Sequence, residues 1–200
     1  MGPRPRSAPK TRFDRVLYET PEIVLTPTLG MIVPGSFLIV SKIHIHGFAS
    51  LSEESLSRVD SSIRYILGRL RPLFGEYLVF EHGSPIKAIE SHGGCITHAH
   101  FHLFPTAKET GPMILNALPW QELGCLFQLS QARGLAYALV GLDGHYSLSK
   151  SPRLPSQWIR RVVVDSLSSS KHWDWGVEFG YKELEETLAK LSQIGPWGSM

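Results

Sequence analysis

Three histidines at alternate positions, His98, His100 and His102, are the residues whose type and spacing point most directly to chemistry. Alternation with period two is typical of a β-strand, in which residues i, i+2 and i+4 share one face. A strand rises about 3.3 Å per residue, so the three imidazoles would form a row roughly 13 Å long. The intervening side chains would face a core on the other side; they are Ala99, Phe101 and Leu103.

The spacing alone leaves three interpretations of this row open. Neutral imidazole is the commonest zinc ligand, and two adjacent histidines could share one zinc ion, although the outer pair lies too far apart to do so. A polar strand face with satisfied hydrogen bonds is the second interpretation. The third is nucleophilic catalysis, in which the middle imidazole attacks while its neighbours orient it and protonate the leaving group.

The segment 98–104 reads His-Ala-His-Phe-His-Leu-Phe and resembles the His-φ-His-φ-His-φ-φ motif, with φ hydrophobic, of the histidine triad (HIT) superfamily of nucleotide hydrolases and transferases. The upstream run 16–25 is similar to the opening strands of that family. The run 33–44 is similar to its PGH-x-L-hydrophobic-hydrophobic-P-K-x-H segment. The resemblance covers roughly residues 15 to 107, about half of the chain.

The resemblance implies a division of labour among the three histidines. HIT enzymes break a bond at a nucleotide's α-phosphate through a covalent nucleotidyl-histidine. By resemblance, His100 is the nucleophile, His102 contacts the phosphate and the leaving group and could protonate the latter, and His98 orients its neighbours. An imidazole with a pKa of about 6.5 is largely unprotonated near neutral pH, as a nucleophile must be.

A phosphate contact is expected just before the histidine row. Neither Gly93 nor Gly94 carries a Cβ, so their backbone amides could approach an anion closely, although glycine pairs are also ordinary turn residues. Cys95 stands where HIT relatives often have Ser or Thr touching the phosphate, and a thiol is a weaker donor than a hydroxyl.

Two positions depart from the family pattern. The histidine of the PGH segment is Ser36, and the residue that usually grips the ribose hydroxyls corresponds to Thr28. Nucleotide recognition is therefore expected to differ in detail. The candidates to take over binding are Glu81 or His82, Lys42 and a cluster near residue 160.

That cluster comprises Ser156, Gln157, Arg160 and Arg161. A helix start capped by Ser156 and followed by guanidinium groups would suit a phosphate. An exposed basic helix is the alternative interpretation.

Composition narrows the class of protein. Lys plus Arg number 20 against 18 Asp plus Glu, a net charge of +2, which gives no basic stripe for nucleic acid. Two cysteines argue against a disulfide scaffold and favour a reduced, cytoplasmic location. No apolar run reaches 18 residues, so no membrane segment is expected. With 42% hydrophobic residues the chain can bury a sizeable core.

An amphipathic helix of roughly 18–20 residues is predicted after Ser50 or Ser52, either of which could cap it. Pro72 and Gly75 are expected to end this helix. Further on, residues 120–131 are expected to form a short helix, residues 136–140 a strand that turns at 143–144, and residues 182–191 a final helix.

The expected fold is α+β and HIT-like, with a mainly antiparallel sheet, a long helix packed on it and a C-terminal helical appendage. Residues 1–12 are expected to be a disordered basic tail, residues 13–107 the core domain, residues 108–194 an extension packed on the core, and residues 195–200 a tail.

The expected function is a nucleotidyl hydrolase or transferase acting on a dinucleoside polyphosphate, a nucleotide sugar or a nucleotidylated metabolite. A nucleotide-binding or sensing module with little turnover is the alternative, followed by a His-ligated metal enzyme. The expected partner is a nucleotide substrate, with neither nucleic acid nor membrane, and the resemblance makes a homodimer plausible. No metal or organic cofactor is expected.

Overall fold

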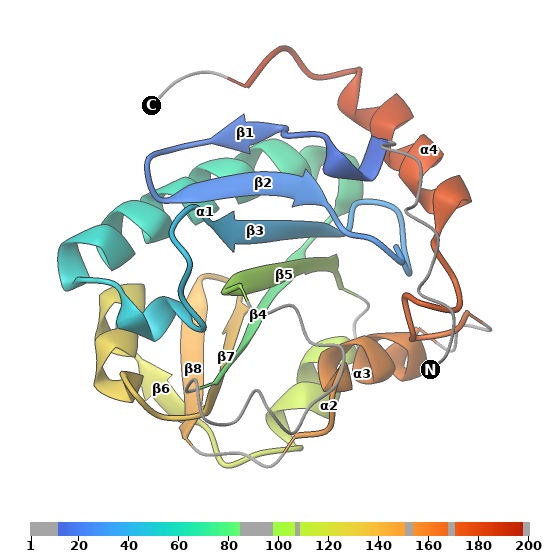
Figure 1. Ribbon diagram of the computed structural model, residues 1–200. Helices are drawn as coiled ribbons and strands as arrows, with labels where there is room; N and C mark the ends of the chain where they lie inside the picture. The colour runs from blue at the N-terminus through green and yellow to red at the C-terminus, as the bar shows by residue number, and fades with distance from the viewer. Residues whose placement is uncertain (1–11, 85–97, 107–108, 151–153, 168–170, 198–200) are drawn as a thin grey trace, which may run out of the picture.

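The computed structural model describes residues 12–84, 98–106, 109–150, 154–167 and 171–197 (Figure 1). Within these ranges eight strands form one antiparallel sheet in the order β1-β2-β3-β5-β4-β7-β8-β6. The strands are β1 (Tyr18–Glu19), β2 (Ile23–Pro27), β3 (Phe37–Ser41), β4 (Tyr77–Gly83), β5 (His100–Pro105), β6 (Gln121–Leu123), β7 (Tyr137–Leu142) and β8 (His145–Lys150). The predicted α+β class with a mainly antiparallel sheet is confirmed.

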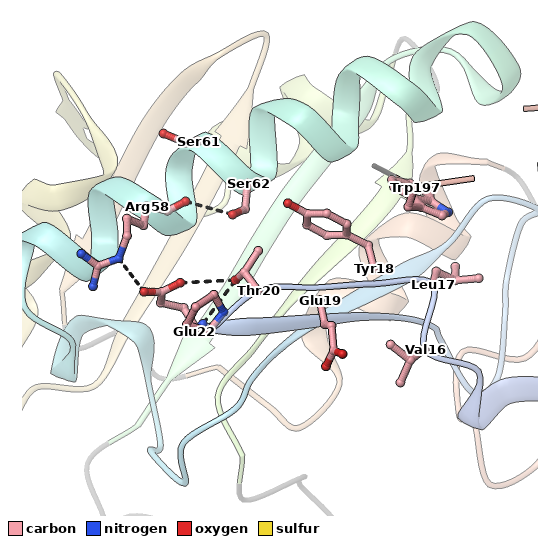
Figure 2. A pocket seen from close by; sticks show the side chains of 11 residues that line it. Val16, Leu17, Tyr18, Glu19, Thr20, Glu22, Arg58, Ser61, Ser62 and Trp197 are labelled. Carbon is pink, nitrogen blue, oxygen red and sulfur yellow. Dashed lines mark hydrogen bonds and ion pairs between the residues drawn. The ribbon is translucent and has the colours of Figure 1, made fainter. Parts of the chain in front are cut away.

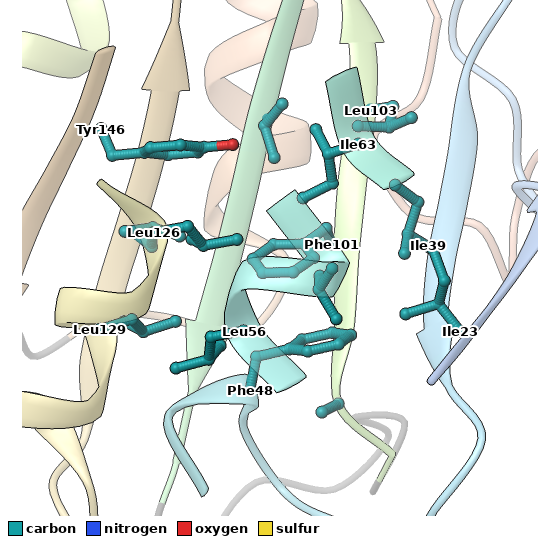
Figure 3. Close-up of a cluster of buried hydrophobic side chains, with 14 of the residues drawn as sticks. Ile23, Ile39, Phe48, Leu56, Ile63, Phe101, Leu103, Leu126, Leu129 and Tyr146 are labelled. Carbon is teal, nitrogen blue, oxygen red and sulfur yellow. The ribbon is translucent and has the colours of Figure 1, made fainter. Parts of the chain in front are cut away.

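Helices cover both faces of the sheet. They are η1 (Arg12–Asp14), η2 (Phe48–Ser50), α1 (Glu53–Phe74), α2 (Thr110–Leu115), η4 (Leu126–Ala132), α3 (Trp158–Ser166) and α4 (Tyr181–Leu191). The larger core cluster joins α1, η2 and η4 to one face of the sheet (Figure 3). A second cluster joins α2 and α3 to the other face.

The long helix α1 follows the sequence prediction with two adjustments. Of the two predicted caps, Ser52 is the one used, because its side chain accepts a hydrogen bond from the Ser55 amide. Pro72 lies inside the last turn instead of ending the helix, and Gly75 follows as the C-cap at φ +85°. The helix is therefore 22 residues long, slightly longer than predicted.

β5 occupies the middle of the sheet between β3 and β4. Its side chains alternate as predicted, because Phe101 and Leu103 are fully buried on the α1 side. Phe104 packs with the α3 cluster on the opposite side, the side that also carries the histidines. A central strand leaves its residues little freedom to shift, since both neighbours fix its register.

Residues beyond 107 build more of the sheet than a helical appendage would. Three strands, β6, β7 and β8, come from this region, and β7 pairs directly with β4. The predicted strand and turn at 136–144 are confirmed by β7, β8 and the positive φ of Asp143 and Gly144. The prediction of a short helix over 120–131 is only half right, because residues 121–123 extend along β8 as an edge strand.

Both ends of the described chain differ from expectation. Arg12, placed in the predicted tail, belongs to η1. At the other end, Trp197 packs against Tyr18 and Tyr65, and the backbone carbonyls of residues 195 and 196 accept hydrogen bonds from Arg69. The segment 195–197 is thus part of the packed structure. Among the residues that are described, no helix combines the length and the apolar character needed to cross a membrane.

Candidate active site

The three histidines are linked in series. His98 Nε2 lies 2.8 Å from the Ile43 carbonyl oxygen, and His100 Nδ1 lies 2.8 Å from the carbonyl oxygen of His98. His100 Nε2 is 3.2 Å from His102 Nε2. The loop after β3 therefore holds His98, His98 holds the ring of His100, and His102 faces the far nitrogen of that ring.

This arrangement fixes the positions of the protons. A carbonyl oxygen can only accept, so His100 Nδ1 must donate to His98 and carry the proton. In the neutral ring, His100 Nε2 then holds the lone pair. Because Nε2 can only accept, the contact with His102 requires the proton to lie on His102 Nε2. His102 Nδ1 is left as a buried acceptor with no partner among the described residues.

Burial keeps both central imidazoles neutral. Loss of solvation lowers the pKa of His100, against the opposing effect of its hydrogen bond to the His98 carbonyl. The pKa of His102 falls well below the ordinary value, first through burial and then through the proximity of His100 and of Arg160. A neutral His100 suits a nucleophile, whereas a neutral His102 is a hydrogen-bond donor and poorly suited to protonate a leaving group as predicted.

Glu81 and His82 lie on opposite faces of β4, so only one of them shares the histidine face. Phe80 is paired with His102 across the β4–β5 ladder. His82, two residues further along β4, lies on the same face as Phe80 and is exposed. Glu81 points to the α1 side. The strand geometry therefore leaves His82, and not Glu81, beside the histidine row.

Glu81 is instead a member of a buried hydrogen-bond network. Its side chain is 1% exposed; one carboxylate oxygen accepts from the Phe48 amide at 2.8 Å and the other from the Tyr137 hydroxyl at 2.5 Å. The Tyr137 oxygen accepts from the Ala49 amide at 3.1 Å. Burial raises the pKa of Glu81 to about 8, against both hydrogen bonds. This acid fixes η2 and hence the end of the loop that holds His98.

Four other residues were predicted to contact the substrate near the histidine row. Gly93, Gly94 and Cys95 lie outside the described residues. Lys42 is exposed and forms an ion pair with Glu19 at 3.3 Å, which a ligand would have to displace.

The two family departures are both buried. The Ser36 hydroxyl donates to the Val33 carbonyl at 2.8 Å, and the Thr28 hydroxyl donates to Leu29 at 3.3 Å. These hydroxyls serve local turns.

The predicted phosphate cluster near residue 160 lies around the start of α3, and its members have different environments. α3 begins at Trp158, and its N-cap is Gln157 in a left-handed conformation at φ +57°, so the predicted cap Ser156 lies one residue too early. Gln157 Nε2 donates to Asp174 at 3.3 Å, while its Oε1 is buried with no partner among the described residues. Arg161 is exposed and stacks over Trp173 at 3.9 Å, but Arg160 is buried.

Two further histidines lie beside the row. The ring of His44 is 5.2 Å from that of His98 and 5.3 Å from that of His46. Both follow β3, in the loop whose Ile43 carbonyl binds His98. The Lys-x-His spacing at the end of the run 33–44 was the sequence signal for them. Within the described ranges, no group of three or more His, Cys, Asp or Glu side chains has an arrangement that could hold a metal ion.

A groove of about 650 Å³ lies elsewhere, between β1 and the middle of α1 (Figure 2). Its walls are Tyr18, Arg58, Ser62 and Trp197, together with the turn that joins β1 to β2. Arg58 forms an ion pair with Glu22 inside it. No histidine lines this groove, so it is separate from the histidine row.

No protein-family model and no curated protein matches this sequence. Among solved structures, a HIT-like protein involved in cell-cycle regulation from Bartonella henselae has a TM-score of 0.38 and 19% identity, over 46% of this chain and 67% of its own. A hypothetical histidine triad nucleotide-binding protein from Sulfolobus tokodaii has a TM-score of 0.37 and 14% identity, over 92% of this chain and 91% of its own. Both neighbours are named for the histidine triad. At these TM-scores the likeness is remote.

Proposed function

We propose that this chain is a nucleotidyl hydrolase or transferase that cleaves a nucleotide conjugate at its α-phosphate and releases a nucleoside monophosphate. The observation that carries the proposal is the hydrogen bond from His100 Nδ1 to the His98 carbonyl, which leaves the lone pair on Nε2. The sequence resemblance to the HIT superfamily supports the same role for this residue. Dinucleoside polyphosphates, nucleotide sugars and nucleotidylated metabolites are the substrate classes considered.

The first step forms a bond between His100 Nε2 and the α-phosphorus, and the bond from phosphorus to the leaving group breaks with its electron pair. His100 then carries positive charge, and its Nδ1–H continues to donate to the His98 carbonyl oxygen, which stabilises that charge. In the second step an oxygen of water or of phosphate attacks the phosphorus, a proton on that oxygen passes to solvent, and the nitrogen–phosphorus bond breaks. The lone pair returns to Nε2, which completes the cycle.

His102 has a more limited role in this scheme than the one predicted from its position. Its ring is neutral, with the proton on the nitrogen that faces His100. A phosphoryl group bound to His100 would meet this N–H as a hydrogen-bond donor, which stabilises negative charge on a phosphate oxygen. The proton for the leaving group is therefore expected from another source, for example solvent.

A nucleotide-binding module with little turnover is the second candidate. The observation in its favour is that Ser36 and Thr28 are buried and bonded to local carbonyls, so neither the family's PGH histidine nor its usual ribose contact has an available counterpart at these positions. Without a firm hold on the nucleoside, the attacking nitrogen gains less from proximity, and catalysis weakens.

The experiment that separates the two candidates is a product screen. Dinucleoside polyphosphates, nucleotide sugars and nucleoside phosphoramidates carrying adenine, guanine, cytosine or uracil would be incubated with the protein, with and without added phosphate. Release of one nucleoside monophosphate, or of a diphosphate when phosphate is added, supports the proposal. Binding of these compounds without any product would contradict it and favour the sensing module.

A further inference from the structure

Arg160 is a buried cation that forms no ion pair with any carboxylate in the described ranges. The residue is 3% exposed. Its Nε donates to the Trp173 carbonyl at 2.6 Å, and Nη2 donates to the Gly30 carbonyl. Asp174 attracts the guanidinium only from beyond ion-pair contact, and its own carboxylate accepts from the Gly176 amide at 2.9 Å. Two nitrogens of Arg160 thus donate to carbonyl oxygens, and no carboxylate among the described residues neutralises its charge.

The fold places this charge on the histidine face of the sheet. The ring of Trp158, at the start of α3, lies 5.6 Å from that of Phe80, which is paired with His102 across the ladder. The ring of His102 stacks on Phe104, which packs in the cluster that includes Ile159 from the same turn of α3. The first turn of α3, which carries Arg160, therefore packs on the histidine face of the sheet, and the charge of Arg160 adds to the effect of burial in lowering the pKa of His102.

The position of Arg160 is held from both sides. Gly30 has φ +68°, and a Cβ there would lie 2.4 Å from Trp175 Cβ and 2.9 Å from Arg160 Nη2. The Gly30 amide also donates to the Phe179 carbonyl at 3.0 Å. The turn at Gly30 and the segment at Trp173 thus both contact the guanidinium of Arg160, although they are far apart in the sequence. Burying a charge in this way is costly unless something else compensates it.

We propose that Arg160 is a positioning residue whose buried positive charge prepares the histidine site for an anion, namely the phosphate of the substrate. This inference rests on the proposed function and narrows it, because it makes the site selective for substrates whose reacting group is negatively charged. The charge acts through space on the phosphate held between His100 and His102. Direct contact is unnecessary, since in a low-dielectric interior the field of a buried cation extends over several ångströms.

The test compares Arg160→Met with Arg161→Met, a matched control that removes the neighbouring, exposed cation. Binding of inorganic phosphate, of a nucleoside monophosphate and of the same nucleoside without phosphate is measured by calorimetry. Arg160→Met is expected to weaken binding of both anions on the order of tenfold and to leave the uncharged nucleoside unchanged. Equal losses for the nucleoside and its monophosphate would show a merely structural brace and overturn the inference. Arg161→Met is expected to change none of the three.

A second readout needs neither a nucleotide nor turnover. The pKa of His102, followed by NMR, is expected to rise in Arg160→Met and to stay low in Arg161→Met. An unchanged value in Arg160→Met overturns the inference, even if the nucleotide screen succeeds. If Arg160→Met does not fold, Arg160→Lys decides: retained charge must preserve both the low pKa and the preference for phosphate over nucleoside. A failed nucleotide screen with a raised pKa and weakened phosphate binding would refute the proposed reaction alone.

Discussion

On the α1 side of β5, Phe101 stacks on Phe48 with ring centres 4.2 Å apart, and Leu103 is fully buried beside it (Figure 3). The buried acid on that side, Glu81, has a partner for each oxygen. The carboxyl group of Glu81 is thus satisfied by the protein alone. On the opposite side of the same strand, neither His102 Nδ1 nor the charge of Arg160 has a partner of its own among the residues that the structure describes.

The histidine face of β5 carries reactive and charged groups. It carries a nucleophilic lone pair on His100 Nε2, whose contact is the His102 N–H, together with a His102 Nδ1 that has no partner among the described residues and the charge of Arg160. The electrophilic phosphorus of a phosphate would match the lone pair, and its negative oxygens would match the charge. Buried polar groups are normally satisfied within the fold, so His102 Nδ1 is a candidate position for a ligand contact. The Tyr18 hydroxyl, in the cluster on the α1 side, also has no partner among the described residues, so the distinction lies in the chemistry of the groups and not in their number. The contrast between adjacent residues of a single strand therefore separates stability from function.

The contrast is tested most strongly at the nucleophile. His100→Ala is expected to reduce turnover by a factor on the order of 10⁴ or more, because it removes the nitrogen assigned to form the covalent bond. Its free energy of unfolding is expected to change by about 1 kcal/mol or less. Steady-state product formation and urea unfolding measure the two quantities.

The control is His145→Ala, which removes an exposed imidazole from β8 and is expected to leave both quantities unchanged. If His100→Ala kept more than a few per cent of the activity, the assignment of the nucleophile would be wrong.

The neighbouring residue is expected to behave in the opposite way. Phe101→Ala removes a fully buried ring between α1 and the sheet, and is expected to lower the free energy of unfolding by about 3–5 kcal/mol. Phe101→Leu is expected to cost less, because it keeps most of the buried volume. At a temperature where Phe101→Leu stays folded, turnover should remain close to that of the unaltered chain. A loss of activity without loss of stability would contradict the division of the two faces.

The raised pKa of Glu81 predicts that the free energy of unfolding depends on pH. Because its folded pKa is raised to about 8, above the ordinary value of 4.5, the folded chain retains this proton where the unfolded chain has lost it. Its contribution is full below pH 4.5 and is lost as the pH rises through 8, a change of several kcal/mol at roughly 1.4 kcal/mol per pKa unit. The lowered pKa values of His100 and His102 give the opposite slope below pH 6.5.

The quantity to measure is therefore the difference in free energy of unfolding between two chains. Urea unfolding of the unaltered chain and of Glu81→Gln at pH 5, 6.5 and 8 cancels the histidine contributions, and the difference should shrink or reverse as the pH rises. Glu54→Gln, at an exposed carboxylate, is the control and should show no such trend. A difference that stays constant with pH would show that Glu81 does not retain its proton.

The smallest effect is expected for an arginine whose charge is already neutralised. Arg58 is half-exposed on α1 and pairs with both Glu22 and Glu54. Exposed ion pairs contribute little and are screened by salt. Arg58→Gln should therefore change stability only slightly and leave phosphate binding unaltered, unlike Arg160→Met. A comparable loss of phosphate binding in both variants would show that total charge, and not the position of Arg160, attracts the anion.

The sequence predicts those parts of the molecule that depend on local periodicity. The alternation at 98–103 and the helical spacing of the apolar residues from Leu56 to Leu70 each identify an element and its buried face. β6 was missed because its pattern is short and its partner, β8, supplies the reason for it to be extended.

The candidate site was predicted only in part, because its geometry depends on contacts between residues that are far apart in the sequence. Adjacent residues Glu81 and His82 could not be separated until β4 was known to cross the middle of the sheet, which fixes which side each one faces. The role of Arg160 depends on a hydrogen bond to Gly30, 130 residues away, and local sequence carries no signal for such a contact. Its neighbour Arg161 has the same chemistry in the sequence and a different environment in the fold.

The central claim is that His100 accepts the nucleotidyl group. The direct measurement mixes the protein with the best substrate from the screen, stops the reaction within milliseconds at alkaline pH, where a bond from phosphorus to histidine survives, and maps the modified peptide by mass spectrometry. We expect a transient adduct with the mass of a nucleoside monophosphate less water on His100, absent from His100→Ala. Turnover with no adduct, or with an adduct on another residue, would contradict it.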